Sequence, residues 1–223
     1  MKEDLLEISD GKLYSSNDMV KVGCHDCAGC FSCCQDMGQS IWLDPYDVFS
    51  LTRGLEKSFE ELLQREVEFH VEDGLILPNL RMIGETKTSC GFLNQEGRCS
   101  IHAFRPGFCR LFPLGRDYDD NKLRYFLLRD ACPAVNKSKI KVNKWLGVPR
   151  IKDYERYLVE WHSLTKRLRA YFADHIEDEA VNKTINMKFL QCFYMTAYEG
   201  EDFYMEFDVR LGDFEAFLQS LGI

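Results

Sequence analysis

The stretch Cys24-His-Asp-Cys27-Ala-Gly-Cys30-Phe-Ser-Cys33-Cys34 carries five of the ten cysteines of this chain within eleven residues. Its thiols recur at intervals of three residues and then of one. A gap of two residues lets the backbone turn so that two sulfur atoms converge on one metal ion or cluster, and the small residues in these gaps permit that turn. The spacing therefore predicts a metal site built from thiolates.

A second group of cysteines follows later in the chain, at Cys90, Cys99, Cys109 and Cys132. We expect the first 135 or so residues to bring the two groups together. The neighbours Cys33 and Cys34 point in different directions from an extended backbone, so both are not expected to serve one small ion. One of them then belongs to a second site or stays free. Cys24 is either an additional ligand or a bystander.

Composition restricts the classes of function. The 223 residues carry a formal net charge of −8 with a pI near 5.2, which argues against a protein that binds nucleic acid through phosphate contacts. The sequence shows no signal peptide and no membrane-spanning segment, so we expect a cytoplasmic protein without a membrane partner. In a reducing compartment, metal binding explains ten cysteines better than disulfides do.

The order of local patterns predicts an α+β fold. Its first part, residues 1–148, is expected to be an irregular, cysteine-rich metal-binding domain with small antiparallel strands and short helices. Its second part, residues 149–223, is expected to be a helical region packed against the first. Residues 1–23 form a polar lead-in with at most one short strand or helical turn, and the alternation in residues 38–43 predicts a strand.

Several local signals mark the middle of the chain. Asp44-Pro45 predicts the start of a helix that ends at Gly54, and Ser58 with Glu61 forms the pattern of a capping box. Asp73-Gly74 predicts a hairpin turn between residues 67–71 and 75–77, with Pro78 at an edge or at the end of a strand.

Around the second cysteine group we expect a turn at residues 94–97, with Cys90 and Cys99 on the two sides of a hairpin. Pro106, Gly107 and Pro113 exclude a long helix around Cys109 and predict an irregular loop. Residues 123–128 should form a strand that leads to Cys132. The basic run 137–144 is interpreted as a solvated connection.

The last third has helical periodicity. A helix that starts at Pro149 presents a wide apolar face, and a second helix spans residues 179–198. On the second helix Cys192 shares a side with Phe189 and Phe193, so we interpret it as a small core residue. Residues 203–218 form a third helix or a broken pair.

The cysteines also carry a resemblance. The order Cys27-x-x-Cys30-x-x-Cys33-Cys34, Cys90, Cys99-Ser-Ile-His, Arg105-Pro-x-x-Cys109-Arg and Cys132 resembles the YkgJ-type cysteine-cluster family over about half the chain. Its members are described as zinc- or iron-chelating domains or iron–sulfur oxidoreductases, and they include flagellin lysine methylases. His102 stands where the family often has an aromatic residue, and we interpret it as a structural residue on a half-buried strand.

These observations predict that the chain is a metal-cluster protein. The predicted ligands are Cys24, Cys27, Cys30, Cys33, Cys34, Cys90, Cys99, Cys109 and Cys132. The predicted cofactor is an iron–sulfur cluster, 4Fe-4S before other types, with zinc as the alternative. Four thiolates leave about two negative charges on either centre, which Arg105 and Arg110 are placed to balance.

The predicted role is redox or electron transfer with a partner that the sequence does not identify. The alternatives are a zinc-stabilised interaction module and an enzyme that resembles the protein lysine N-methylases. The sequence shows no catalytic set that would decide between them.

Overall fold

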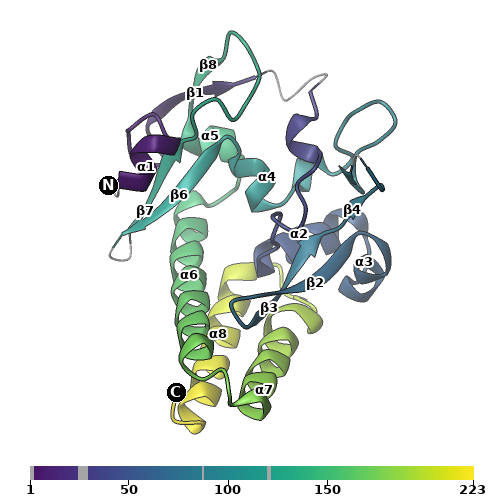
Figure 1. The fold of residues 1–223 in the computed structure, drawn as a ribbon, viewed down its shortest axis with the longest axis vertical. Helices are drawn as coiled ribbons and strands as arrows, with labels where there is room; N and C mark the ends of the chain where they lie inside the picture. Colours follow the sequence, from purple (N-terminus) through teal and green to yellow (C-terminus); the bar gives the residue numbers. More distant parts are fainter. Residues whose placement is uncertain (1–2, 25–29, 87, 120–121) are drawn as a thin grey trace. The chain divides into compact units, whose positions relative to one another are not determined.

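The computed structural model describes residues 3–24, 30–86, 88–119 and 122–223. It confirms the α+β class, because small two-stranded antiparallel sheets and short helices are followed by longer helices near the C-terminus (Figure 1). The residues form two compact units, and each is built from several segments of the chain. The first comprises Met1–Met37, Met82–His102 and Gly107–Glu160, and the second comprises Gly38–Arg81, Ala103–Pro106 and Trp161–Ile223. The expected domain boundary after residue 148 stays a prediction.

The described part of the first unit holds three two-stranded sheets, β1–β8, β4–β5 and β6–β7. Its elements are α1 (Glu3–Ile8), β1 (Met19–Gly23), η2 (Ser32–Cys34), β4 (Met82–Ile83), β5 (Ser89–Cys90), α4 (Gly107–Leu111), β6 (Leu114–Asp119), β7 (Lys122–Leu127), β8 (Ser138–Lys141), α5 (Val142–Leu146) and the start of α6 (Ile151–Asp174). The 3₁₀ helix η3 (His102–Phe104) begins in this unit.

The lead-in is more ordered than the sequence predicts, since it contains both a helix, α1, and a strand, β1. In β1, Val20 and Val22 are buried and alternate with exposed residues, as expected for a strand with one face in the core. The lead-in is also tied to β7, where the backbones of Tyr14 and Tyr125 exchange two hydrogen bonds of 2.7 and 2.9 Å. The pairing with a distant strand orders this segment.

The basic run was wrongly interpreted as a solvated connection. It forms strand β8, which pairs with β1, and helix α5, in which Val142 and Leu146 are buried. Lys139 and Lys141 are exposed, while the backbone between them is held in the ladder. The charge pattern indicates which face of this strand is exposed to solvent, but it gives no sign that the strand pairs with β1.

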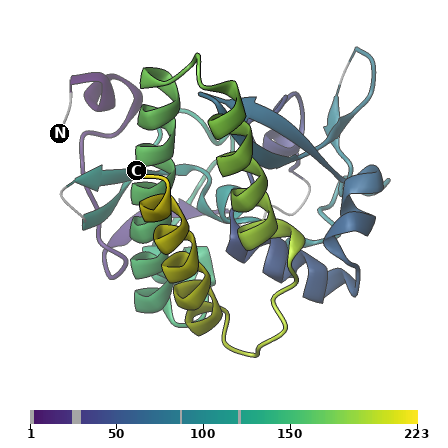
Figure 2. The same cartoon turned by 90° about the horizontal axis from the view of Figure 1, so that it is seen from below.

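The second unit contains one hairpin and most of the helices. Its elements are α2 (Pro45–Leu55), α3 (Phe59–Arg65), β2 (Val67–Glu72), β3 (Leu75–Leu80), the rest of α6, α7 (Glu179–Leu190), the π-helix η4 (Gln191–Met195) and α8 (Phe203–Ser220). Figure 2 shows the chain leaving the green helix α7 and passing through a loop into the yellow helix α8, which confirms a single third helix.

The local signals in this unit are confirmed. The Asp44 side chain accepts a hydrogen bond from the N–H of Asp47 and completes a capping box with it, and Ser58 does the same with Glu61. Helix α2 ends one residue beyond the predicted Gly54. Asp73 and Gly74 have φ values of +48° and +80° between β2 and β3, as the tight hairpin turn requires.

The strand predicted for residues 38–43 is wrong, because only one bridge forms there, between Trp42 and Asn79. Beside it, the N–H of Leu43 donates to the carbonyl of Pro78 at 2.9 Å. Pro78 lies within β3 on the edge that faces this segment, and it has no N–H to return the bond. The buried Tyr194 hydroxyl donates to the Leu43 carbonyl instead, at 3.0 Å.

The core of the second unit is aromatic. Trp161 of α6 contacts Phe189, Phe193 and Phe207, with ring centroids 5.2–6.3 Å apart. Cys192 is half-buried rather than a core residue, with its Sγ 3.9 Å from the carbonyl oxygen of Arg210. It lies in the π-helix η4, where the wider turn breaks the helical spacing from which its burial was predicted. Within the described residues, no helix has both the length and the apolar character needed to cross a membrane.

Candidate metal centre

The end of the first cysteine stretch packs against the turn of the second group. Cys34 closes the 3₁₀ helix η2 by donating its N–H to the carbonyl of Phe31 at 2.9 Å. The Phe31 ring lies over Gly97, which has a φ of +71°, so that a Cβ at Gly97 would lie 2.9 Å from Cδ1 of the ring. Gly97 is therefore needed both for the turn and for the close approach of Phe31.

A second contact places Cys34 opposite Cys90. Gln35 and Ser89 form an antiparallel bridge, and the next residues extend it: Asp36 N–H donates to the Thr88 carbonyl, and Thr88 N–H donates to Asp36 Oδ1, each at 2.9 Å. In this register Cys34 is the partner of Cys90. Two thiols 56 positions apart in the sequence thus come from facing segments.

The turn predicted at residues 94–97 is confirmed, and it brings the chain back so that Cys99 lies near Cys90. The Gly97 N–H donates to the Asn94 carbonyl at 3.0 Å, and Leu93 forms a bridge with Cys99. The predicted hairpin reduces to this single bridge, because β5, which holds Cys90, pairs with Met82 of β4 instead. Cys90 and Cys99 lie at the two ends of one closed turn.

Cys109 lies on a helix where the sequence predicted an irregular loop. Helix α4 has only five residues, since Pro106 precedes it and Pro113 follows it, and these prolines exclude only a longer helix. His102 was also wrongly placed on a strand, because it starts the 3₁₀ helix η3. The reason is the same for Cys109 and His102. A single helical turn can pair backbone N–H and C=O groups even in a segment too short for a longer helix.

The pKa values of two thiols report their neighbours. The pKa of Cys34 is raised far above its ordinary value, first by a hydrogen bond with Cys33, then by burial and by the nearby thiols of Cys109 and Cys90. Burial raises the pKa of Cys90, with smaller effects from Cys99 and Cys33, while a hydrogen bond from the Phe92 N–H lowers it. These thiols would repel one another as thiolates, and a bound cation reverses that repulsion. The donor set therefore suits a metal.

Cys24 and Cys132 reach the site from the β1–β8 ribbon. Gly23, the last residue of β1, pairs with Ser138, the first residue of β8, so that Cys24 and the loop before Ser138 leave the ribbon at the same end. A Cβ at Gly23 would lie 2.2 Å from Ser138 Oγ and 3.2 Å from its carbonyl oxygen. In the loop, Lys137 Nζ donates to the Cys132 carbonyl at 2.8 Å.

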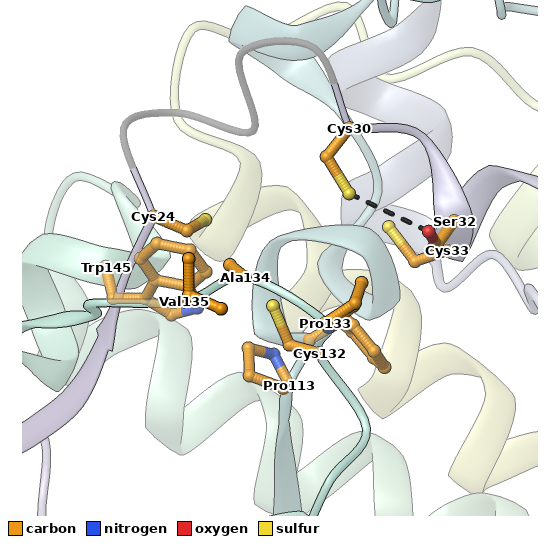
Figure 3. Close-up of a pocket in the computed structure, with 11 residues that line it drawn as sticks. Cys24, Cys30, Ser32, Cys33, Pro113, Cys132, Pro133, Ala134, Val135 and Trp145 are labelled. Atoms are coloured by element: carbon orange, nitrogen blue, oxygen red, sulfur yellow. Dashed lines mark hydrogen bonds between the residues drawn. The ribbon is translucent and has the colours of Figure 1, made fainter.

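Four of the cysteines line a cavity of about 220 Å³ (Figure 3). The Sγ of Cys30 is 3.8 Å from Ser32 Oγ, and the sulfur atoms of Cys30, Cys33 and Cys132 point into the same space. The Trp145 ring is held at the cavity by a hydrogen bond of 3.4 Å from Nε1 to the Leu111 carbonyl. The lining residues are Cys24, Cys30, Ser32, Cys33, Phe112, Pro113, Cys132, Pro133, Ala134, Val135 and Trp145.

The predicted ligands thus divide by location. Cys24, Cys30, Cys33 and Cys132 line the cavity, whereas Cys34 neighbours Cys90 and Cys109, and Cys90 neighbours Cys99. Cys33 also neighbours both Cys34 and Cys90. Cys27 lies outside the described residues. Within the described ranges, no group of three or more cysteine, histidine, aspartate or glutamate side chains already surrounds a point where an ion could bind.

The two predicted arginines differ in position. Arg110 lies on α4 beside Cys109 and reaches the end of α5, where its Nη1 is 4.0 Å from the position of a Cβ on Gly147. Arg105 lies between η3 and α4 and belongs to the second unit. Their role in balancing the charge of a bound metal stays a prediction.

Sequence reasoning missed two contributors to this site. Gly23 is needed for the close approach of β1 and β8, and Trp145 forms part of the cavity wall. The alternation of buried Val20 and Val22 is a signal from which a strand ending just before Cys24 could have been found. The sequence offers no such signal for Trp145, because its place depends on the fold of α5.

A comparison with protein families agrees with this site. The model of the family CxxCxxCC, described as a "Putative zinc- or iron-chelating domain", matches residues 26–137, which is half of the chain. The matched segment includes every predicted cysteine ligand except Cys24. No curated protein and no solved structure matches this chain significantly.

Proposed function

Because the chain belongs to the CxxCxxCC family, whose domain is described as chelating zinc or iron, we propose that it binds an iron–sulfur cluster through cysteine thiolates and acts in redox or electron transfer. The observation that carries this proposal is the cavity of about 220 Å³ that Cys24, Cys30, Cys33 and Cys132 line together. These four thiols come from segments more than 90 residues apart in the sequence.

The size of the cavity favours a cluster over a single ion. Four thiolates at about 2.3 Å from one zinc ion close tightly around it and leave no space between them. A 4Fe-4S cluster also takes four thiolates, but it is a body of eight atoms that needs a cavity of its own. The cavity here offers space for such a group, and sulfur is the donor that iron–sulfur clusters require.

The walls of the cavity suit electron transfer. Phe112, Pro113, Pro133 and Trp145 present apolar surface beside the thiols. When bound, the cluster supplies one-electron redox chemistry, and burial and hydrogen bonds set its potential. Arg110, next to Cys109, and Arg105 are proposed to balance the negative charge of the thiolates.

The test is spectroscopic. Protein purified without oxygen should be brown, contain iron and sulfide, and show a broad absorption near about 400 nm that dithionite bleaches. Electron paramagnetic resonance of the reduced protein then identifies the cluster type. Colourless protein with stoichiometric zinc and no iron would contradict the proposal.

A zinc-stabilised interaction module is a second candidate. It is favoured by the neighbouring thiols of Cys34, Cys90, Cys99 and Cys109, since four cysteines are one of the ligand sets of a structural zinc site. In that case the metal would hold the turn and α4 in place without taking part in a reaction. Elemental analysis of the same preparation distinguishes the two candidates.

A further inference from the structure

We infer that the thiols form two separate metal centres. The first, the cavity set, consists of Cys24, Cys30, Cys33 and Cys132, and it holds the cluster. The second, the turn set, consists of Cys34, Cys90, Cys99 and Cys109, and it holds a single tetrahedral ion of the zinc class. The occupant of the cavity set rests on the proposed function, whereas the division into two sets does not.

Different backbone ladders place the cysteines of the two sets that come from distant segments. In the cavity set, Cys24 and Cys132 are placed by the end of the β1–β8 ribbon, where Gly23 pairs with Ser138. In the turn set, Cys34 and Cys90 are placed by the bridge of Gln35 with Ser89, and Cys99 by its own bridge with Leu93. Neither ladder contributes a cysteine to both sets.

The boundary between the sets lies between Cys33 and Cys34. Cys33 lines the cavity, while Cys34 does not belong to the described lining and faces Cys90 across the bridge. The backbone at these residues is not extended as expected, because Cys33 and Cys34 lie in the 3₁₀ helix η2. Consecutive side chains on such a helix leave the backbone in different directions, so we assign the pair to two centres. Cys33 neighbours both Cys34 and Cys90, so the two proposed centres lie next to each other.

Ligand number supports the same division. Cys24, Cys30, Cys33 and Cys132 all line the cavity. Four is also the number of thiolates that a 4Fe-4S cluster takes. The remaining four thiols match the closed Cys₄ set of a structural zinc ion. Cys27 lies outside the described residues and is assigned to neither set.

The experiment compares one variant from each set in the full chain, purified without oxygen. The wild-type protein should contain about four iron atoms and about one zinc ion. Cys132→Ser should lose most of the iron and the absorption near about 400 nm and keep its zinc, whereas Cys99→Ser should lose the zinc and keep the absorption. Cys192→Ser, in the second unit, is the matched control and should keep both metals.

Native mass spectrometry of the wild-type protein tests the inference where a variant fails to fold, because its mass should include one cluster and one zinc ion. A single centre per chain, or folded variants of both sets that lose the same metal, would overturn the inference. Two zinc ions without iron, one lost in each variant, would overturn the proposed function and support the division.

Discussion

The two units of this chain are stabilised by different means. In the first unit, single bridges and short turns bring the cysteines together, and every described thiol there is half-buried. In the second unit, Phe189, Phe193 and Phe207 are fully buried and contact Trp161, and the buried Phe214 packs on Phe189 and Phe193. From this difference we expect the thiol region to depend on a bound metal, because isolated bridges supply little stability, whereas the aromatic core should be stable through burial alone.

Removal of the metal should produce the largest difference in stability between the two units. Metal binding is linked to folding and supplies on the order of 10 kcal/mol in small zinc domains. An anaerobic chelator should therefore increase hydrogen exchange in residues 30–36 and 89–99 by several orders of magnitude, while α7 and α8 stay protected. Equal loss of protection in both units would contradict this expectation.

Truncation of the aromatic core should have the next largest effect. Phe193 is fully buried, and Phe193→Ala should cost about 3–5 kcal/mol through lost burial and the cavity left behind. Urea unfolding followed by circular dichroism measures the loss. Met187→Ala, at a position 60% exposed on α7, is the matched control and should change stability little. Metal content per folded chain should stay the same, and a fall in it would show that the units are not independent in this respect.

A substitution in the β1–β8 ribbon should have a smaller and more local effect. Gly23→Ala introduces a Cβ that would lie 2.2 Å from Ser138 Oγ, and the strain should cost about 1–3 kcal/mol. Because Cys24 is the next residue, iron content should fall as well. The double variant with Ser138→Ala removes the closest contact, so it should recover part of both losses. No recovery would show that the two residues do not act through this contact.

The smallest effect is a pH dependence of the metal-free protein. The pKa of Cys34 is raised mainly by its hydrogen bond with Cys33, and that of Cys90 mainly by burial. A thiol with a raised folded pKa stabilises the fold below its unfolded pKa of about 8.5 and loses that contribution as the pH rises.

Thermal unfolding of the metal-free protein should therefore shift to lower temperature above about pH 8.5. In the metal-loaded protein the ligands are already thiolates, so its Tm should stay constant over the same range. A metal-free Tm that rises with pH would contradict the sign of both shifts.

Local chemistry explains which elements could be predicted. Asp44 and Ser58 cap their helices as expected, and Asp73-Gly74 makes its turn, because each depends on residues only a few positions apart. The segment 38–43 and the run 137–144 were interpreted wrongly, since their structure depends on Pro78 and on β1 respectively. Patterns of alternation and charge carry no information on the distant partner of a strand.

The amino-acid sequence by itself determined that this protein has an α+β fold and a cysteine cluster for zinc or iron, because thiol spacing and capping residues act at short range. Only the tertiary structure decided which cysteines line the same cavity. The bridge of Gln35 with Ser89 and the pairing of Gly23 with Ser138 join segments separated by 54 and 115 positions, and no local pattern specifies such a register. Long-range backbone hydrogen bonds, and the close approach of strands that glycine allows, determined which cysteines lie together.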